Sequence, residues 1–250
     1  MTDLTRLTAI EVTDLLRIGA ISPLDCLDAL ERRITAVNGP VNALVTLCFG
    51  RARDNAKRLM ELPVHERGRL SGLPVPIKDL VDVAGVRSTQ GSPIFKDVVP
   101  SQSDIMVKHL EDEGGVVYAM SNTPEFGAGA HTFNEVFGIT RNPWDTRLSA
   151  SGSSGGAAAA LATGMAWVAH GSDLGGSLRN PASFCGVTGM RPSPRPHHRS
   201  DSGAPKRTSA MRVRVAGVVS AGSASIGKNP VAMISLFGRC GASWRNSRTT

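Results

Sequence analysis

The stretch Ser151-Gly-Ser-Ser-Gly-Gly-Ala-Ala-Ala-Ala-Leu-Ala-Thr-Gly164 begins with small polar residues and ends as an apolar helix former. A second turn of the same kind, GSDLGGS over residues 171–177, follows a few residues later. Two Gly- and Ser-rich turns therefore flank one short apolar segment. Because glycine lets a backbone bend tightly or approach another group closely, the turns predict a place where the chain meets a ligand. Glycines that only permit tight turns are the alternative at this point.

Neither turn matches a common phosphate-binding or nucleophile motif. No lysine follows the glycines, so the P-loop pattern fails, and the dinucleotide pattern GxGxxG is absent from both turns. The GSSG of residues 152–155 has the wrong spacing for the nucleophile elbow GxSxG. A nest of backbone N–H groups that binds an anion stays open as an interpretation.

Helical and strand patterns alternate along the first three quarters of the chain. A capping box at Thr8 and Glu11 starts the first helix, and Ser22-Pro23 caps the second. Further helices are predicted over residues 24–37, 51–62, 103–113 and 157–163, with a short one opening at 123–125. Strands are predicted over residues 41–47, 73–82, 116–120 and 165–170. This alternation indicates an α/β fold with a mixed or parallel sheet.

Charge divides the chain near residue 191. Residues 191–250 hold 11 of the 28 Lys and Arg residues but one of the 21 acidic residues, a net charge of +10, and the remainder carries −3. After about residue 194 the periodicity is lost, and only a strand over 211–219 and a short helix over 231–237 are predicted. We therefore expect residues 1–194 to form the fold and residues 195–250 to be a poorly ordered basic tail.

The composition limits the kinds of partner and the cellular compartment that we expect for this chain. No apolar run reaches the roughly 20 residues that span a bilayer, and the N-terminus lacks a secretory pattern, which argues against a membrane partner. The four cysteines are scattered, which fits a reducing cytoplasm and predicts no metal site. The basic tail could contact nucleic acid, but with only Phe237 and Trp244 as aromatic residues it offers little base stacking, so a nucleic-acid partner is not expected.

Lys78 lies inside an apolar, strand-like run, Val75-Pro-Ile-Lys-Asp-Leu-Val81. Burying a charged amine is costly unless it is paired or neutralised. A lysine at a strand end, or one paired with Asp79 or Asp82, is the structural alternative. A buried lysine can instead have a lowered pKa and serve as the general base that a hydroxyl nucleophile needs.

Together these segments resemble the amidase signature family. The resemblance rests on GLPVPIKDLVDVAG (72–85), SGSSGGAAAALATG (151–164) and GSDLGGSLRNPASFCGVTGMRPS (171–193), joined by the similar connecting segments SNTPEFG and RNPWDTR. It covers roughly residues 5–193. It implies the amidase signature fold, an α/β fold with a mixed β-sheet core flanked by helices, here incomplete at the C-terminus.

The resemblance implies a catalytic triad that needs no cofactor. By motif position Ser177 would be the acylated nucleophile, Ser153 the bridging serine in a cis peptide bond, and Lys78 the base. Backbone N–H groups would bind the oxyanion, those of Leu174, Gly175, Gly176 and Ser177. Ser154 would support the site.

Other residues near the motifs are expected to support the site without taking part in the reaction. Asp173 and Arg179 are expected to hold the loop around the nucleophile. His170 is expected to be a core or supporting residue, and Cys185 a core residue.

The implied function is an amidase that cleaves the carbon–nitrogen bond of a small-molecule carboxamide through an acyl-serine. Two alternatives stay open: the glutamine-hydrolysing component of a tRNA amidotransferase, its A chain, and an inactive amidase fragment with a basic tail. A homodimer is also left open.

The chain departs from the family pattern at two places. Ala150-Ser151 stands where the family has Pro-Gly. After residue 194 the family's continuation is not recognisable, and the tail reads like out-of-frame translation, which suggests a truncated or frameshifted amidase.

Overall fold

The computed structural model describes residues 3–191 and 216–219. The helices in this part of the chain are α1 (Ala9–Arg17), α2 (Pro23–Val41), α3 (Phe49–Glu61), α4 (Ile105–Asp112), α5 (Gly155–Ala162) and α6 (Arg179–Cys185). The strands are β1 (Leu44–Leu47), β2 (Pro74–Lys78), β3 (Val116–Ser121), β4 (Phe133–Asn134), β5 (Gly138–Ile139), β6 (Val168–Gly171), β7 (Thr188–Gly189) and β8 (Ala216–Val219). Short 3-10 turns occur at Leu4–Arg6, Val64–Glu66, Pro93–Phe95 and Glu125–Gly127.

The two N-terminal helices begin at the residues that the sequence predicts. Thr8 accepts a hydrogen bond from the N–H of Glu11, and Glu11 accepts one from the N–H of Thr8, so the capping box at α1 is confirmed. Ser22 and Asp25 form the same reciprocal pair at the start of α2. Helix α2 runs four residues beyond the predicted end and stops at Asn42, which has a left-handed conformation.

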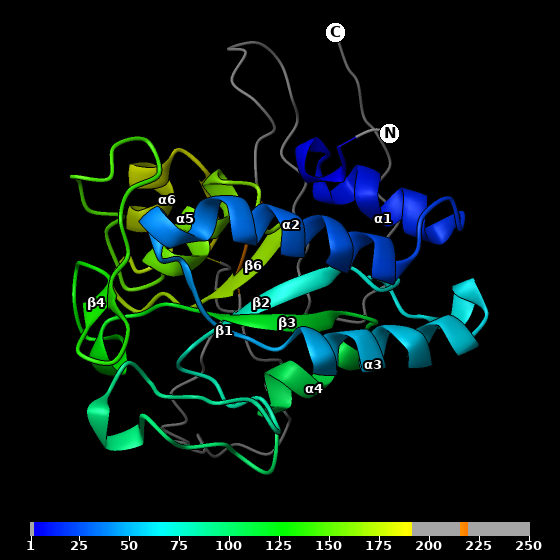
Figure 1. Ribbon diagram of the computed structural model, residues 1–250, viewed down its shortest axis with the longest axis horizontal. Helices are drawn as coiled ribbons and strands as arrows, with labels where there is room; N and C mark the ends of the chain where they lie inside the picture. The colour runs from blue at the N-terminus through cyan, green and yellow to red at the C-terminus, as the bar shows by residue number, and fades with distance from the viewer. Residues whose placement is uncertain (1–2, 192–215, 220–250) are drawn as a thin grey trace, which may run out of the picture.

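The central sheet is mixed, as predicted. Strand β3 pairs with β1 in antiparallel register and with β2 in parallel register, and every residue of β2 and β3 is buried. In Figure 1, α1 and α2 lie above these strands, α3 and α4 lie below them, and α5 and α6 gather beside β6. A buried, helix-flanked sheet of this kind explains why β2 and β3 read as near-continuous apolar runs.

Strand β6 lies beside β2. It pairs in antiparallel register with β8, which in turn pairs with β7. Lys78, at the C-terminal end of β2, therefore lies beside the strand that leads into the second Gly- and Ser-rich turn.

Helix α5 packs closely against the central sheet because its first residues are small. Its residues Gly155 to Leu161 are all buried. A Cβ added to Gly156 would lie 2.4 Å from the backbone nitrogen of Asn122 and 2.7 Å from the carbonyl oxygen of Ala43. The alanine-rich sequence thus serves close packing, and the preceding serines are held at the sheet edge.

Several elements differ from the sequence-based expectation. The strand predicted over residues 73–82 ends at Lys78. The N–H groups of Leu80 and Val81 donate to the carbonyl oxygen of Lys78, so the chain turns there. Strand β6 starts at Val168, three residues late, and helix α6 and the β4–β5 hairpin were not predicted. Strand β8 meets the prediction for 211–219 at residues 216–219, whereas the predicted helix at 231–237 lies outside the described residues, as does most of the basic tail. Among the described helices none is long and apolar enough to cross a membrane.

Candidate active site

Three segments meet at the C-terminal end of β2: the end of that strand, the turn before α5, and the loop after β6. Hydrogen bonds join the two Gly- and Ser-rich turns directly. The N–H of Ser154 donates to the carbonyl oxygen of Ser177 over 3.1 Å, and the Ser154 hydroxyl donates to the carbonyl oxygen of Ser172 over 3.2 Å. Ser154, predicted to support the site, therefore fastens one turn to the other.

Lys78 is fully buried, and its amine contacts two serine hydroxyls. The distance from Nζ to Oγ is 2.7 Å for Ser153 and 3.0 Å for Ser172. Burial lowers the pKa of Lys78 to about 7, and the negative charge of Asp173 opposes that shift. A lysine with this pKa is partly neutral at physiological pH, so its nitrogen is able to accept a proton.

Ser153 lies where the resemblance requires a bridging hydroxyl. The Gly152–Ser153 peptide bond is cis, and the Ser153 side chain is buried against Lys78. Ser151, which replaces the family's glycine, has a φ of 60°. Its carbonyl oxygen accepts from Thr132 at 2.8 Å and its N–H donates to Ser149 at 2.9 Å, so neighbouring hydroxyls hold this uncommon backbone conformation.

Ser177 is half-buried and lies just before α6. Its carbonyl oxygen is fixed by Ser154, but among the described residues its hydroxyl forms no hydrogen bond with Ser153. The structure therefore brings Lys78 and Ser153 into direct contact and holds the Ser177 backbone beside them. Catalytic hydrogen bonds are often long in the absence of substrate and tighten only in its complex.

The loop that carries Ser177 is organised by Asp173. Its buried carboxylate accepts from the N–H of Gly176 at 2.8 Å and of Leu178 at 3.1 Å, and from two guanidinium nitrogens of Arg179 at 3.0 Å each. Burial alone would raise the pKa of Asp173, but the hydrogen bonds from Arg179 and from these N–H groups hold it below its usual range. This is the loop-holding role that the sequence predicts for Asp173 and Arg179.

The predicted oxyanion donors divide into two kinds. Leu174 and Gly175 are exposed, and within the described residues their N–H groups and that of Ser177 form no hydrogen bond. The N–H of Gly176 instead donates to Asp173, so in this structure it is directed into the loop.

Sequence reasoning missed two contacts at the site. Ser172 is the second hydroxyl partner of Lys78 Nζ, and only its place just after an apolar strand could have suggested it. The backbone at Gly127 also lies against Ser153, because a Cβ added there would be 3.7 Å from Ser153 Oγ. The neighbouring Phe126 is half-exposed and packs edge-on against Phe95, with ring centroids 6.1 Å apart.

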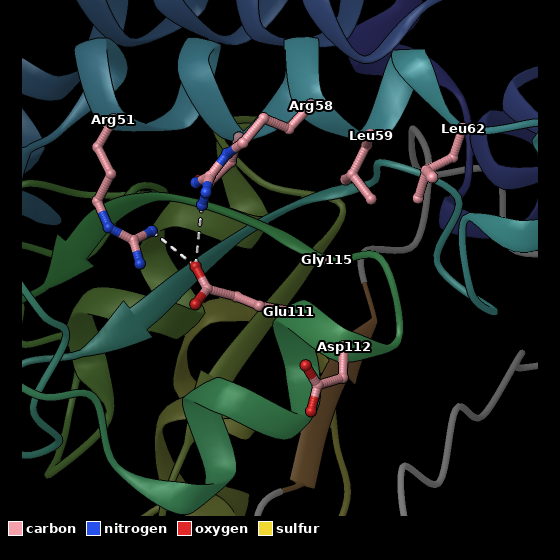
Figure 2. Close-up of a pocket in the computed structure, with 8 residues that line it drawn as sticks. Arg51, Arg58, Leu59, Leu62, Glu111, Asp112 and Gly115 are labelled. Atoms are coloured by element: carbon pink, nitrogen blue, oxygen red, sulfur yellow. Dashed lines mark hydrogen bonds and ion pairs between the residues drawn. The ribbon is translucent and has the colours of Figure 1, made fainter.

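A separate pocket lies between α3 and α4 (Figure 2). Arg51 Nη1 is 2.7 Å from Glu111 Oε1, and the Asn55 amide donates to the same carboxylate oxygen over 3.1 Å. Arg58 and Asp112 add one further charge of each sign, so the pocket is balanced. None of the predicted site residues lines it. In the part of the chain that the structure describes, no group of three His, Cys, Asp or Glu side chains could hold a metal ion.

Comparison with known proteins places this chain in a family. Residues 25–225 match the family described as Amidase, and the match continues past residue 194. The A component of the glutamyl-tRNA(Gln) amidotransferase from Halothermothrix orenii is 42% identical over 191 residues, which are 76% of this chain and 39% of that protein.

Solved structures are similar over the same part of the chain. A bacterial aryl acylamidase of the amidase signature family superposes with a TM-score of 0.69 at 33% identity, over 75% of this chain and 39% of the other. A substrate complex of 6-aminohexanoate cyclic dimer hydrolase gives a TM-score of 0.68 at 33% identity, over 74% and 37%. The chain thus spans about two fifths of the length of the proteins it matches. The family match and the superposed structures agree, and the chain belongs to the amidase signature family.

Proposed function

We propose that this chain hydrolyses the carbon–nitrogen bond of a carboxamide through an acyl-enzyme on Ser177. The observation that carries the proposal is the buried amine of Lys78, which has a pKa of about 7 and lies 2.7 Å from the hydroxyl of Ser153. Such an amine is a base poised near neutral pH, and a serine hydroxyl needs such a base to become a nucleophile.

The first half of the reaction forms the acyl-enzyme. Ser177 Oγ bonds to the amide carbon and gives its proton to Ser153 Oγ, which passes its own proton to Lys78 Nζ. The electron pair of the carbonyl moves to oxygen and makes a tetrahedral oxyanion. When the pair returns, the carbon–nitrogen bond breaks, and the leaving nitrogen takes the proton back along the same relay as ammonia or an amine.

The second half releases the acid. A water molecule attacks the ester carbon of acyl-Ser177, and its proton passes through Ser153 to Lys78. The ester bond to Ser177 Oγ then breaks, the proton returns to that oxygen, and a carboxylic acid leaves, which ionises at neutral pH. The triad is restored to its starting state, and neither half requires a metal or a cofactor.

Backbone N–H groups of the 174–177 loop would stabilise the oxyanion. The N–H of Gly176 already donates to Asp173, so the proposal rests on those of Leu174, Gly175 and Ser177. A Cβ at Gly175 would meet nothing within 4 Å, which leaves open space for a substrate there. Donors fixed in advance stabilise charge as it develops in the transition state without reorganising.

A second candidate function is glutamine hydrolysis in a tRNA amidotransferase. It is favoured by the 42% identity to proteins named as the A component of such an enzyme. Steady-state ammonia release from small aliphatic and aromatic carboxamides, compared with release from glutamine, separates the two. Activity on glutamine alone, increased by the other components of a homologous amidotransferase, would favour the second function.

Covalent labelling tests the proposal without knowledge of the substrate. The full chain is treated with a serine-reactive fluorophosphonate and its intact mass is measured, alongside Ser177→Ala and Lys78→Ala. We expect one adduct on the wild type, none on Ser177→Ala and slow labelling of Lys78→Ala. A folded chain that takes no adduct would contradict the proposal and favour an inactive family member. Sedimentation of the labelled chain would also test for the homodimer.

A further inference from the structure

His170 on β6 holds the main chain of the catalytic lysine. Its imidazole is 1% exposed, and its Nδ1 accepts the backbone N–H of Lys78 over 3.2 Å. On the other side of β2 the backbone pairs with β3, where the N–H of Asp79 donates to Ser121. The Lys78 N–H points the opposite way, toward β6. Its acceptor there is the His170 side chain, whereas in a regular sheet the acceptor would be a backbone carbonyl oxygen.

The hydrogen bond fixes the protonation of the ring. Because Nδ1 accepts, it carries no proton, and the neutral ring keeps its proton on Nε2. Nε2 is buried and has no hydrogen-bond partner among the described residues. Burial, and then the charge of Lys78, lower the pKa of His170 to about 3, so the ring stays neutral where Lys78 titrates.

We infer that His170 is a positioning residue, which anchors the backbone of Lys78 to β6 so that the amine reaches Ser153. The inference rests on the proposed function of Lys78 as a base. The same segment supplies Ser172 two residues later, and its hydroxyl contacts the lysine Nζ at 3.0 Å. One short stretch of chain therefore holds both ends of the lysine, the backbone through His170 and the amine through Ser172.

Loss of the imidazole would leave a buried N–H without an acceptor and a cavity beside the lysine. The end of β2 would then move or take up water, and a misplacement of about 1 Å can cost roughly a hundredfold in rate. Water near the amine would also favour its charged form. The charged neighbours are Asp173, whose charge favours the protonated lysine, and the buried Asp79, which directly follows β2.

Two amide substitutions test the position of the acceptor. Counted in bonds from Cβ, the oxygen of Asn is as far out as Nδ1 of histidine, whereas the oxygen of Gln is one bond further. His170→Asn therefore keeps an acceptor for the Lys78 N–H, and His170→Gln keeps the polarity but displaces it. His170→Ala removes the acceptor altogether. The measured quantity is the rate of fluorophosphonate labelling of Ser177 as a function of pH.

The labelling rate should rise with pH along an acid limb and then reach a plateau. We expect the plateau rate of His170→Ala and His170→Gln to fall at least about tenfold, and their acid limb to move to higher pH. His170→Asn should keep a limb close to that of the wild type. Tyr118→Phe is the matched control, because its buried hydroxyl on β3 donates to Met165 and does not contact the lysine. That variant should lose stability without moving the limb.

A second measurement does not depend on activity. NMR titration of the Lys78 side chain in chains labelled with ¹³C-lysine gives its pKa in each folded variant. If His170→Ala and His170→Gln leave both the lysine pKa and the acid limb unchanged, the positioning role is wrong while the proposed function stands. If the wild type takes no label but its lysine pKa rises in His170→Ala and not in His170→Asn, the positioning holds and the hydrolase proposal fails.

Discussion

The N–H of Ser154 donates to the carbonyl oxygen of Ser177 over 3.1 Å, and this bond joins residues that are 23 positions apart. Between them lie helix α5 and strand β6, which pack against β2 and bring the chain back to the sheet edge. The two Gly- and Ser-rich turns are thus held together by one short helix–strand segment, α5 and β6. Lys78 enters from the neighbouring strand, so the site depends on how β2 and β6 sit next to each other.

The rate of Ser177 labelling should follow the protonation of Lys78. Only the neutral amine accepts a proton, so the rate should rise with pH and level off above a midpoint near the lysine pKa of about 7. Each pH unit below that value lowers the neutral fraction about tenfold. His170, with a pKa of about 3, does not titrate in this range.

The measurement is the labelling rate of the wild-type chain between about pH 5 and 9, corrected for the hydrolysis of the probe. Lys78→Ala is the control and should have no limb near neutral pH. A rate that keeps rising toward pH 10 would indicate a lysine with an ordinary pKa and would contradict its role as a neutral base.

Burial of Lys78 should make the fold less stable at neutral pH than at alkaline pH. The lysine pKa falls from its ordinary 10.5 to about 7 on folding, so between these values the unfolded chain binds more protons. The free energy of unfolding should therefore rise with pH across that window. Below it, the full cost of burying the charged lysine is present. Lys78→Met removes the penalty, which is on the order of several kcal/mol.

Urea denaturation at about pH 6.5 and pH 10.5 checks this expectation. Lys78→Met should be more stable than the wild type at the lower pH, and the difference should shrink at the higher one. An equal difference at both values would mean that the lysine has the same pKa in the folded and unfolded chain.

The sequence singled out the residues of the candidate site, but not all of the contacts that hold them. Lys78, Ser153 and Ser177 stand in local motifs, and the first two meet as the resemblance implies. Ser172 and His170 act through the contact between β2 and β6, which lie almost a hundred residues apart in the sequence. No local pattern specifies which side chain of one strand will face a neighbour that far away.

The fold was predictable where apolar periodicity was long. Helices α1 to α4 and strands β2 and β3 were predicted within a few residues, because caps mark α1 and α2 and buried apolar runs mark the two strands. Helix α6 was missed because it has seven residues, contains Pro181 and has little periodicity. The β4–β5 hairpin was missed because each of its strands has only two residues.

Asp173→Asn should loosen the loop that carries Ser177. The carboxylate accepts from backbone N–H groups and from Arg179, and an amide has one acceptor oxygen in place of two. We expect a lower labelling rate and a lower melting temperature. Because folding lowers the pKa of Asp173, its contribution to stability is present above the ordinary value of 3.8 and is lost as the pH falls below it.

Thermal melts of Asp173→Asn at about pH 7 and pH 3 measure this contribution, and the difference from the wild type should shrink in acid. Asp14→Asn is the matched control, because Asp14 is exposed on α1, lies 3.7 Å from Arg17 and is outside the site. It should melt like the wild type at both pH values. A melting difference for Asp173→Asn that does not change between the two would contradict the lowered pKa.

Gly156→Ala should destabilise the fold at the contact between α5 and the central sheet. The added methyl group would lie 2.4 Å from the Asn122 nitrogen and 2.7 Å from its carbonyl oxygen, and backbone atoms cannot move aside as a side chain can. We expect a loss of at least about 2 kcal/mol in the free energy of unfolding. Gly50→Ala in α3 is the matched control, because its methyl group meets nothing within 4 Å, and alanine there should stabilise the helix. Urea denaturation of both variants decides the question: if Gly156→Ala is as stable as Gly50→Ala, α5 does not pack as closely as the structure has it, and the serine turn before it is not fixed by that contact.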